Sequence, residues 1–529
     1  MAKTVYITTP LYYVNAAPHI GHSYTTIAAD CLARYGRLRG DEVFLLTGTD
    51  EHGQKIHQAA DAAGLSPQVF VDQVVEQFAA LWKTLTISHD DFIRTTQPRH
   101  VRAVQTILTR LHDAGKLTRA TYQGWYCTPD ETFWTEAELA AGRAEQTAPA
   151  CPTCQRPLDA VKEEGWSLRL RASQAWLRGF VESHPTFVQP QSRRNELLGL
   201  LEEPLPEYLC ITRPRQRVSW GIPVPFSREH VVYVWFDALL NYITVPGYVD
   251  DAARFARLWP ATVQLIGKDI LRHHAVYWPI MLHEMGLPDA QMPQRIFAHG
   301  WWKIGEQKMS KSLGNIVDPR VVIGQVLKGQ PLATDIYRYF LLREVPFGQD
   351  GEFSEDALFM RFGADLANDL GNLVHRTLSM IHRYADGKLP AAESVGYAVE
   401  DEPLRAAALA LPQTLDETMT ALNFSAALEA IMRLVNQANR YIEQQAPWQL
   451  AKASHQARLM TVLALLAELL RVVSIVLEPF MPSVAESIWR QLGFGEAPRR
   501  LHDVSRWPGL TPGQPIGQPR VLFPKAEAR

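Results

Sequence analysis

Hydrophobic and polar positions in the first fifty residues follow two different periods. Thr4–Thr9 is a short run of β-branched and aromatic residues that predicts a strand, and Gly21–Leu38 places apolar side chains on one face of a predicted helix. Val43–Thr47 predicts a second strand, which ends in a polar turn at Gly48–Gly53. A strand, a turn, a helix and a second strand in this order are typical of a parallel α/β sheet. Ligands of such sheets bind at the carboxyl ends of the strands.

The α/β pattern lapses between Lys116 and Pro225, which we interpret as an insertion, and then resumes. Three further short strands are expected at Val231–Trp235, Val263–Ile266 and Ile296–Ala298. From about residue 363 the pattern becomes almost wholly helical and predicts a bundle that packs as a separate domain. The predicted helices of this bundle are Ala367–Arg383, Glu402–Met419, Ser425–Glu443 and Ala457–Leu477.

Length and composition describe a globular protein of more than one domain. The chain has 529 residues, of which 47% are hydrophobic and 21% charged, and its net charge is −3. Its first residues lead straight into a strand-like run without the features of a signal peptide. The most apolar stretch, Leu459–Val476, carries Glu468 and Arg471 and predicts a buried helix rather than a membrane span. The five cysteines are too few for a disulfide scaffold. From these features together we expect a cytoplasmic protein without a membrane partner.

The first candidate site is the string Pro18-His19-Ile20-Gly21-His22, which opens the predicted helix directly after the first strand. A helix amino terminus presents backbone N–H groups to a phosphate, and Gly21 allows a close approach. His19 and His22 can donate hydrogen bonds to charge that develops on phosphate oxygens. The alternative is that two histidines flank a glycine at an ordinary helix cap. Their position after the first strand favours the functional interpretation.

The second candidate site is the string Lys308-Met309-Ser310-Lys311-Ser312. Two ammonium groups three residues apart on a mobile loop suit a leaving pyrophosphate, although two nearby lysines are more often a solvated surface pair. Between the two strings, Gly267-Lys268-Asp269 follows a predicted strand. Asp269 is placed there to bind a ribose hydroxyl or an amino group, or simply to cap a helix.

Two cysteine-containing strings have the spacing of a zinc knuckle: Cys127-Thr128-Pro129-Asp130 and Cys151-Pro152-Thr153-Cys154. Asp130 stands where a second cysteine is expected. Three thiolates and one carboxylate still complete a tetrahedron, because carboxylate oxygen is an accepted zinc ligand. The alternative is a degenerate knuckle that keeps free thiols.

Together these residues resemble the signature pair of the class I aminoacyl-tRNA synthetases, and the chain resembles the methionyl-tRNA synthetases of the shorter bacterial type over nearly its whole length. Besides the two strings, the resemblance is carried by Thr9–Asn15, Thr47–Gly53, Trp220–Pro225, Tyr233–Ala238 and Phe297–Trp301. The resemblance implies that the protein makes methionyl-adenylate from L-methionine and ATP and then transfers methionine to tRNA(Met).

The resemblance also implies a role for each site residue. On spacing alone, Trp235, Leu239 and Tyr242 predict a helical core stripe, but the resemblance places them in a methionine pocket. The implied methionine-binding residues are Leu11, Tyr13, Asp50, Trp235, Leu239, Tyr242 and His299. The implied ATP-binding residues are His19, Gly21, His22, Gly267, Asp269, Lys308 and Lys311, and the implied catalytic residues are His19, His22, Lys308, Lys311 and Arg213.

The helical bundle would read the anticodon through Asn368, Asn372, Arg376 and Trp448. Two amides, a guanidinium and an indole suit splayed RNA bases, whereas without the resemblance the amides would be solvated helix residues and the indole would be bundle core. The implied metal ligands are Cys127, Asp130, Cys151 and Cys154. Expected cofactors are ATP, Mg²⁺ and Zn²⁺. Whether zinc binds is left open by Asp130, which stands in place of a cysteine. We expect a monomer, because the chain ends after the bundle.

The implied fold is an α/β Rossmann-type parallel-sheet catalytic domain with an inserted zinc-knuckle-like connective domain, followed by an α-helical anticodon-binding bundle. In residue numbers, the expected segments are the two catalytic halves at 1–115 and 226–305, the insertion at 116–225, a lysine-loop and stem-contact linker at 306–362, the bundle at 363–506 and a tail at 507–529.

Three alternatives to this function remain open. A synthetase of the same class for valine, isoleucine or leucine would need an editing domain, for which the insertion of roughly 110 residues is too short. An RNA-binding paralogue without catalysis would not need His19, His22, Lys308 and Lys311. A small-molecule adenylyltransferase can share the histidine string, but it would not need a helical bundle with Arg376 and Trp448.

Overall fold

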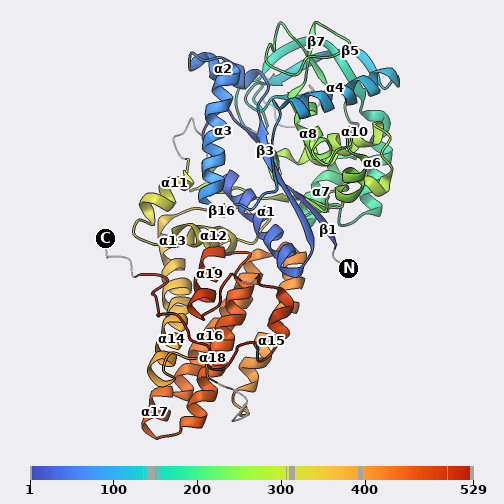
Figure 1. Cartoon of the computed structure of the whole chain (residues 1–529). Coiled ribbons are helices and arrows are strands. Elements are labelled where there is room, and N and C mark those ends of the chain that lie inside the picture. The colour runs from blue at the N-terminus through green and yellow to red at the C-terminus, as the bar shows by residue number, and fades with distance from the viewer. Residues whose placement is uncertain are drawn as a thin grey trace.

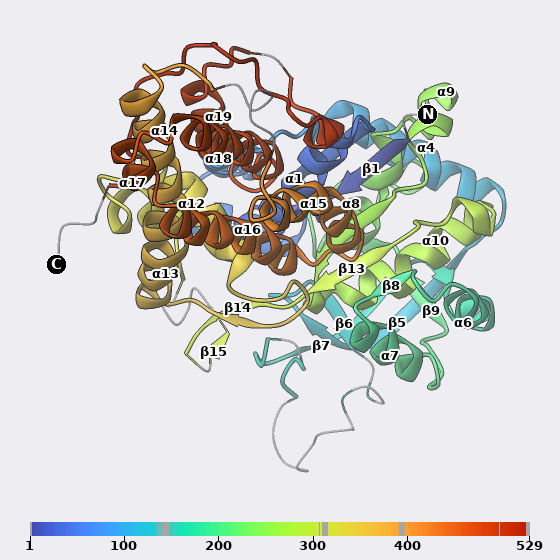
Figure 2. The same ribbon diagram turned by 90° about the horizontal axis from the view of Figure 1, so that it is seen from below.

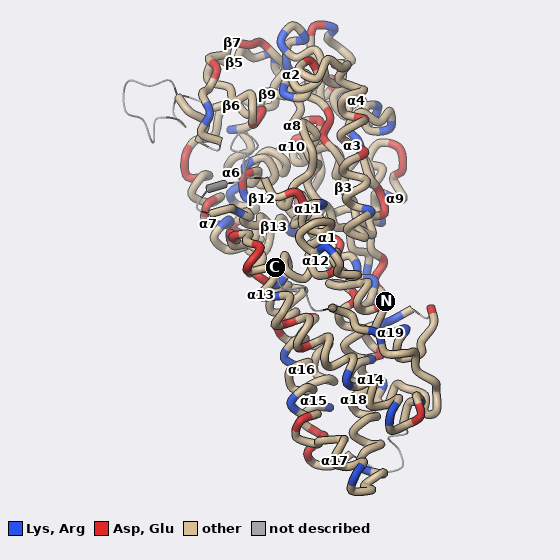
Figure 3. Tube along the Cα trace, turned by 90° about the vertical axis from the view of Figure 1, so that its left-hand side faces the viewer, with Lys and Arg blue, Asp and Glu red and all other residues tan. Residues whose placement is uncertain are grey.

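The protein is elongated, with an α/β part at one end and a helical part at the other (Figure 1). The computed structural model describes residues 3–134, 136, 139, 149–152, 154–305, 307–308, 316–390, 397–496 and 498–524. Figure 2 shows helices α14 to α19 gathered on one side and strands β1, β8 and β13 on the other. Acidic and basic residues are mixed along the whole trace (Figure 3), which agrees with the small net charge.

The α/β part is built on a sheet whose neighbouring strands all pair in parallel. Its order is β2-β3-β1-β12-β13-β8, with β4 also paired to β3. Ile7 of β1 lies opposite Val263 of β12, so two segments about 255 residues apart in the chain form adjacent strands. The strands are β1 Thr4–Thr8, β2 Tyr12–Tyr13, β3 Glu42–Asp50, β4 Asp91–Arg94, β8 Val188–Gln189, β12 Val263–Gly267 and β13 Ile296–His299.

Alternate side chains of each strand enter the cores on opposite faces of this sheet. Ile7, Leu45 and Leu265 pack in the core that contains α1, whereas Tyr6, Leu46 and Ile266 pack in the core that contains α8 and α10. This period of two is expected for strands that are covered on both faces. The covering helices are α1 Ile20–Arg39, α2 Gln54–Ala62, α3 Pro67–Thr84, α4 Pro98–Asp113, α8 Val234–Thr244, α9 Ala252–Leu258 and α10 Trp278–Glu284.

The predicted insertion forms an antiparallel sheet of its own, in the order β6-β5-β7-β9. The insertion is not wholly separate, however, since β8 lies within it and pairs with β13 of the main sheet. Its elements are β5 Leu117–Cys127, β6 Thr132–Trp134, β7 Asp159–Arg169, α6 Gln174–Ser183, α7 Gln191–Leu200 and β9 Tyr208–Cys210.

The strand predicted at Val231–Trp235 is shorter than expected. Strand β11 covers His230–Val232 and pairs with β10, Thr212–Pro214, and α8 begins at Val234 after the extended residue Tyr233. The strand ends at Val232 because the following residues have helical periodicity. Trp235, Leu239 and Tyr242 therefore lie along one side of α8.

The helical part is centred on α18, Gln456–Val476. This helix is long and apolar enough to cross a membrane, but 94% of its most apolar window is buried among the other helices, so it forms the core of the bundle. The carboxyl-terminal segment lies back on it: the backbone N–H groups of Gly509 and Leu510 donate to Glu468. The other helices are α12 Ala333–Arg343, α13 Glu355–Arg361, α14 Asn372–Tyr384, α15 Glu402–Thr420, α16 Phe424–Gln445, α17 Pro447–Lys452 and α19 Pro482–Gln491, with a π-helical segment at Phe362–Gly371.

A buried ion pair joins the two parts. Arg338 of α12 lies 2.8 Å from Asp30 of α1, and both side chains are fully buried. The same guanidinium donates to the carbonyl groups of Leu85, Pro479 and Phe480. Helix α1 therefore begins near the carboxyl end of β1 and is bonded near its middle to the helical part.

We expect Arg338→Ala to destabilise the protein by about 3–5 kcal/mol, because it leaves the buried Asp30 with Arg34 as its remaining cation and removes the donor of three backbone carbonyl groups. Calorimetric unfolding measures this loss. Arg405→Ala is the matched control, since Arg405 pairs with Glu402 on the surface and should contribute less than about 1 kcal/mol. A loss from Arg338→Ala no larger than that of the control would contradict this role.

Candidate active site

A pocket of about 920 Å³ lies at the carboxyl ends of β1, β3, β12 and β13. Its walls come from the turn after β1, the end of β3, the start of α1, helix α8, the turn after β12 and part of the insertion. The predicted residues that line it are Leu11, Tyr13, His19, Gly21, His22, Asp50, Trp235, Leu239, Tyr242, Gly267, Asp269 and His299. The sheet thus brings together residues from distant parts of the chain.

The two histidines of the first string cap helix α1 through their Nδ1 atoms. The backbone N–H of Gly21 donates to Nδ1 of His19 (3.1 Å), and that of His19 donates to Nδ1 of His22 (3.1 Å). Their rings stack with centroids 3.9 Å apart. Because Nδ1 is an acceptor, a neutral ring carries its proton on Nε2. Both imidazoles are therefore set up as Nε2–H donors at the positive end of a helix dipole.

The turn after β12 forms the neighbouring wall of the pocket. A side chain on Gly267 would place its Cβ 2.5 Å from Oδ1 of Asp269, so it would displace the Asp269 carboxylate. The indole N–H of Trp301 donates to Asp269 (3.1 Å). Lys268 lies 2.7 Å from Asp350, which also pairs with Lys303 of β14.

The lysine string begins on a short hairpin beside this turn. Strand β14, Trp302–Ile304, pairs with β15, Gln307–Lys308, and Lys303 lies opposite Lys308 in the register. Lys311 lies outside the described residues, as does the side chain of Lys308. The backbone of Lys308 is thereby tied to the strand whose Lys303 side chain pairs with Asp350.

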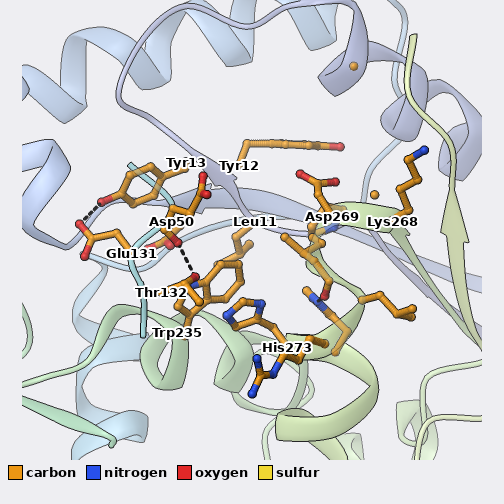
Figure 4. A pocket seen from close by; sticks show the side chains of 18 of the residues that line it. Leu11, Tyr12, Tyr13, Asp50, Glu131, Thr132, Trp235, Lys268, Asp269 and His273 are labelled. Atoms are coloured by element: carbon orange, nitrogen blue, oxygen red, sulfur yellow. Dashed lines mark hydrogen bonds between the residues drawn. The ribbon is translucent and has the colours of Figure 1, made fainter. Parts of the chain in front are cut away.

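Asp50 forms an anionic wall at the other end of the pocket (Figure 4). It is 7% exposed, and its Oδ1 has no hydrogen-bond partner among the described residues. Burial raises the pKa of Asp50 well above its ordinary value, and the nearby carboxylates of Asp237 and Glu131 raise it further. A buried carboxylate of this kind binds an ammonium group well, because the cation supplies both the missing partner and the opposite charge.

Asp237 itself is held between two histidines on the side of α8 away from Trp235. His52 lies 2.7 Å from one carboxylate oxygen and His100 lies 2.8 Å from the other. Although burial favours the neutral acid, these two neighbours keep the pKa of Asp237 below its ordinary value. Since His52 follows Asp50 by two residues, the contact also fixes the turn after β3 against α8.

Aromatic side chains line the pocket next to Asp50. Trp235 stacks on His273 with ring centroids 3.7 Å apart, and the hydroxyl of Tyr242 lies 2.9 Å from Nε2 of His274. Burial lowers the pKa of His274 to about 4, so this imidazole is neutral at physiological pH. An unbranched thioether is favoured by aromatic walls of this kind.

His299 lines the pocket, but both of its ring nitrogens have other partners. Nε2 lies 2.6 Å from the hydroxyl of Thr25, and Nδ1 lies 2.7 Å from the carbonyl oxygen of Gly300. The histidine that pairs with Tyr242 is His274 instead. The turn after β12 leads directly into helical segments, so His274 lies about one turn past Asp269. This spacing is the feature of the sequence from which the position of His274 near the pocket could have been predicted.

Arg213 does not line the pocket. Its side chain is 2% exposed and binds the carboxylate of Glu163 through Nε (2.6 Å) and Nη2 (2.9 Å). The guanidinium also lies over the ring of Tyr126, 4.2 Å from its centroid. Because this cation is already paired inside the insertion, we assign it to the packing of β5, β7 and β10 rather than to ATP.

The knuckle residues converge next to the pocket. One ligand atom from each of Cys127, Asp130, Cys151 and Cys154 lies within 4.8 Å of the others. The Sγ atoms of Cys127 and Cys154 are 3.5 Å apart, and that of Cys151 is 3.1 Å from Asp130. A tetrahedral zinc ion with Zn–S bonds of about 2.3 Å separates its sulfur ligands by about 3.8 Å. The donor set and its spacing therefore fit zinc.

The predicted anticodon residues lie on the helical part. Asn368 and Asn372 are exposed, and the guanidinium of the half-buried Arg376 lies 5.9 Å from the ring centroid of Trp448. Arg376 also pairs with Glu443 at 2.7 Å. The structure thus brings Arg376 and Trp448 together, while Asn368 belongs to the π-helical segment that precedes α14.

This parallel sheet, with a histidine-capped helix after its first strand and a helical bundle beyond it, defines a class I aminoacyl-tRNA synthetase. The family profile described as "tRNA synthetases class I (M)" matches residues 5–378, and "Anticodon-binding domain of tRNA ligase" matches residues 410–515. The chain belongs to the methionyl-tRNA synthetase family.

Individual relatives are similar over nearly the whole chain. A methionine–tRNA ligase from Caldanaerobacter subterraneus subsp. tengcongensis is 47% identical over 100% of this chain and 80% of its own length. One from Thermotoga maritima is 43% identical over 99% of this chain and 80% of its own. The solved structure of Mycobacterium tuberculosis methionyl-tRNA synthetase in complex with methionyl-adenylate is 40% identical, with a TM-score of 0.92 and coverage of 99% of this chain and 100% of that one.

Among the pocket residues that the sequence did not reveal are Glu131, His273 and His274. Glu131 adjoins the knuckle ligand Asp130, and no sequence motif distinguishes it from a surface acid. His273 and His274 stand beside Asp269 in the sequence, and a helix predicted from Asp269 onward would have placed them near the strand end.

We expect methionine to bind more weakly as the pH falls. The raised pKa of Asp50 means that its carboxyl group takes up a proton in the empty pocket at a higher pH than usual, and the protonated form cannot pair with an ammonium group. Tryptophan fluorescence titrations with methionine between about pH 5 and pH 8 measure the affinity. Asp50→Asn should weaken binding by about tenfold or more and remove this pH dependence. An affinity of the unaltered protein that does not change with pH would contradict the assignment.

Proposed function

We propose that the protein is a methionine–tRNA ligase. It activates L-methionine with ATP to give methionyl-adenylate and pyrophosphate, and it then transfers methionine to the 3′-terminal adenosine of tRNA(Met). The observation that carries this proposal is one pocket with the buried Asp50, whose Oδ1 has no partner among the described residues, at one end and the capping histidines His19 and His22 at the other. Such a pocket has a cation-binding end and an anion-binding end.

Methionine occupies the end near Asp50. The carboxylate of Asp50 pairs with the α-ammonium group, and Leu11, Tyr13, Trp235 and Leu239 surround the side chain. Tyr242 and His274 lie together where they can contact the thioether sulfur. Tyr242 donates to Nε2 of His274, whose Nδ1–H donates to the carbonyl of Ile270, so the pair favours sulfur through contacts of its rings with a soft, polarizable thioether.

ATP occupies the other end, along His19, Gly21, His22, Gly267 and Asp269. The methionine carboxylate attacks the α-phosphorus, the bond from that phosphorus to the bridging oxygen breaks, and pyrophosphate leaves. Mg²⁺ bound to ATP would neutralise part of the phosphate charge. The Nε2–H groups of His19 and His22 donate to the phosphate oxygens as their charge rises. Lys308 and Lys311 stabilise the leaving pyrophosphate. Positioning and charge stabilisation carry this step, and no covalent intermediate with the enzyme forms.

In the second step, the terminal adenosine hydroxyl of the tRNA attacks the methionyl carbonyl carbon, and AMP leaves. Asn368, Asn372, Arg376 and Trp448 bind anticodon bases by stacking and hydrogen bonding, which is how proteins usually read unpaired RNA. The protein acts in the cytoplasm as a monomer. The binding of tRNA is supported by the match of residues 410–515 to an anticodon-binding domain and by the likeness to tRNA ligases.

The test is ATP–pyrophosphate exchange by the purified protein, with each of the twenty amino acids supplied separately and no tRNA. We expect exchange with methionine alone, because the pocket combines an aromatic side-chain site with Asp50. Exchange with another amino acid would mean that the pocket assignment is wrong although the class is right. No exchange at all, from a folded protein that still binds tRNA, would favour a non-catalytic RNA-binding paralogue.

Zinc in the knuckle would hold Cys127, Asp130, Cys151 and Cys154 together and so stabilise the insertion beside the pocket. We expect about one zinc ion per chain by mass spectrometry of metals, and loss of it in Cys154→Ser. Cys210→Ser is the control, since the thiol of Cys210 donates to the carbonyl of Thr212 outside the knuckle. Protein purified without chelators that carries almost no zinc would contradict the assignment.

A further inference from the structure

Glu131 connects the knuckle to the methionine end of the pocket. It follows Asp130 directly, its side chain is 4% exposed, and it lies on the pocket wall. Its backbone has a φ of 50°, in the left-handed region that non-glycine residues seldom adopt. In Figure 4 its carboxylate faces Tyr13, on the same side of the pocket as Asp50. A strained residue at this place needs its side-chain contacts to hold it.

The side chain and the backbone carbonyl of Glu131 together contact four elements of the site. Oε1 of Glu131 accepts from the backbone N–H of Lys55 (2.8 Å) and from the hydroxyl of Tyr13 (3.2 Å). Oε2 accepts from the hydroxyl of Tyr126, and the carbonyl oxygen of Glu131 accepts from the hydroxyl of Tyr233. These partners belong to the start of α2, to β2, to β5 and to the residue that precedes α8. Two of them, Tyr13 and the start of α8, carry walls of the methionine end.

The neighbouring turn is shaped to allow these contacts. Gly53 has a φ of 110°, and a Cβ there would lie 2.6 Å from the hydroxyl oxygen of Tyr13 and 3.0 Å from Oε1 of Glu131. The ammonium group of Lys55 donates to the carbonyl of Pro129 (2.7 Å), inside the Cys127–Asp130 turn. Lys55 therefore bonds the start of α2 to the knuckle turn twice, through its backbone to Glu131 and through its ammonium group to Pro129.

We infer that Glu131 is a positioning residue that couples the knuckle turn to methionine binding by fixing Tyr13 and the start of α8. The identity of the ligand rests on the proposed function. Glu131 orients residues of the methionine end, and its hydrogen bonds among the described residues go to Tyr13, Lys55, Tyr126 and Tyr233 rather than to the histidines or the Gly267–Asp269 turn of the ATP end. A change at Glu131 therefore alters methionine affinity selectively.

Glu131→Gln tests this selectivity, because it keeps the size of the side chain and removes the charged acceptor. We expect methionine affinity, titrated by tryptophan fluorescence without ATP, to fall by about tenfold or more. The KM for ATP in pyrophosphate exchange should stay within about twofold, and the zinc content should not change. Glu164→Gln is the matched control, since Glu164 lies in the same insertion and pairs with Arg119 on the surface.

Tyr13→Phe provides an independent variant that leaves the Glu131 carboxylate in place. It should also weaken methionine binding. Its effect should not add to that of Glu131→Gln in the double variant, because both substitutions disrupt the same hydrogen bond between Tyr13 and Glu131. This variant also tests the inference if Glu131→Gln proves unstable.

Several outcomes would overturn the inference. They are an unchanged methionine affinity in Glu131→Gln, an equal rise of the KM values for methionine and ATP, or strict additivity with Tyr13→Phe. The unaltered protein is measured in the same assays. If it shows no methionine-dependent exchange, the proposed function fails, whereas exchange by the unaltered protein with undiminished methionine affinity in Glu131→Gln defeats this inference alone.

Discussion

The parallel pairing of β1 with β12 is the constraint on which the whole site depends. It places the turn after β1 beside the turn after β12, although about 255 residues separate Ile7 from its partner Val263. Parallel strands end at the same edge, so the histidine-capped start of α1, the Asp50 turn and the Gly267–Asp269 turn converge there. The insertion departs from this sheet and returns to it, and in doing so it supplies the knuckle and one pocket wall.

The pocket is divided electrostatically into two ends. At one end Asp50 is surrounded by Glu131 and Asp237, so the empty site has an excess of negative charge that a bound ammonium group relieves. At the other end the dipole of α1 and the two imidazoles favour an anion. An amino acid held by its ammonium group at the first end directs its carboxylate towards the second. The fold thereby aligns the carboxylate nucleophile with the phosphate without a covalent bond between the enzyme and either substrate.

Much of this arrangement can be predicted from the sequence, because it depends on local patterns. The β-branched and apolar runs of β1 and β3, the helix after His19 and the periodicity of the bundle are all readable in the chain, and so are the two signature strings. Side-chain partners are less predictable, since they are set by packing. Arg213 has the chemistry to bind phosphate but is neutralised by Glu163, and His299 is bonded to Thr25, while the hydroxyl of Tyr242 is bonded to His274. Glu131 becomes part of the site only because the knuckle turn folds against Tyr13.

The central claim is that one pocket holds methionine and ATP together and joins them. The most direct measurement is the product that the enzyme retains when stoichiometric protein is mixed with ATP, methionine and pyrophosphatase in the absence of tRNA. The account predicts about one methionyl-adenylate per chain, detected by mass spectrometry after rapid separation. Release of pyrophosphate without a bound adenylate, or an adenylate formed equally well with leucine or isoleucine, would contradict it.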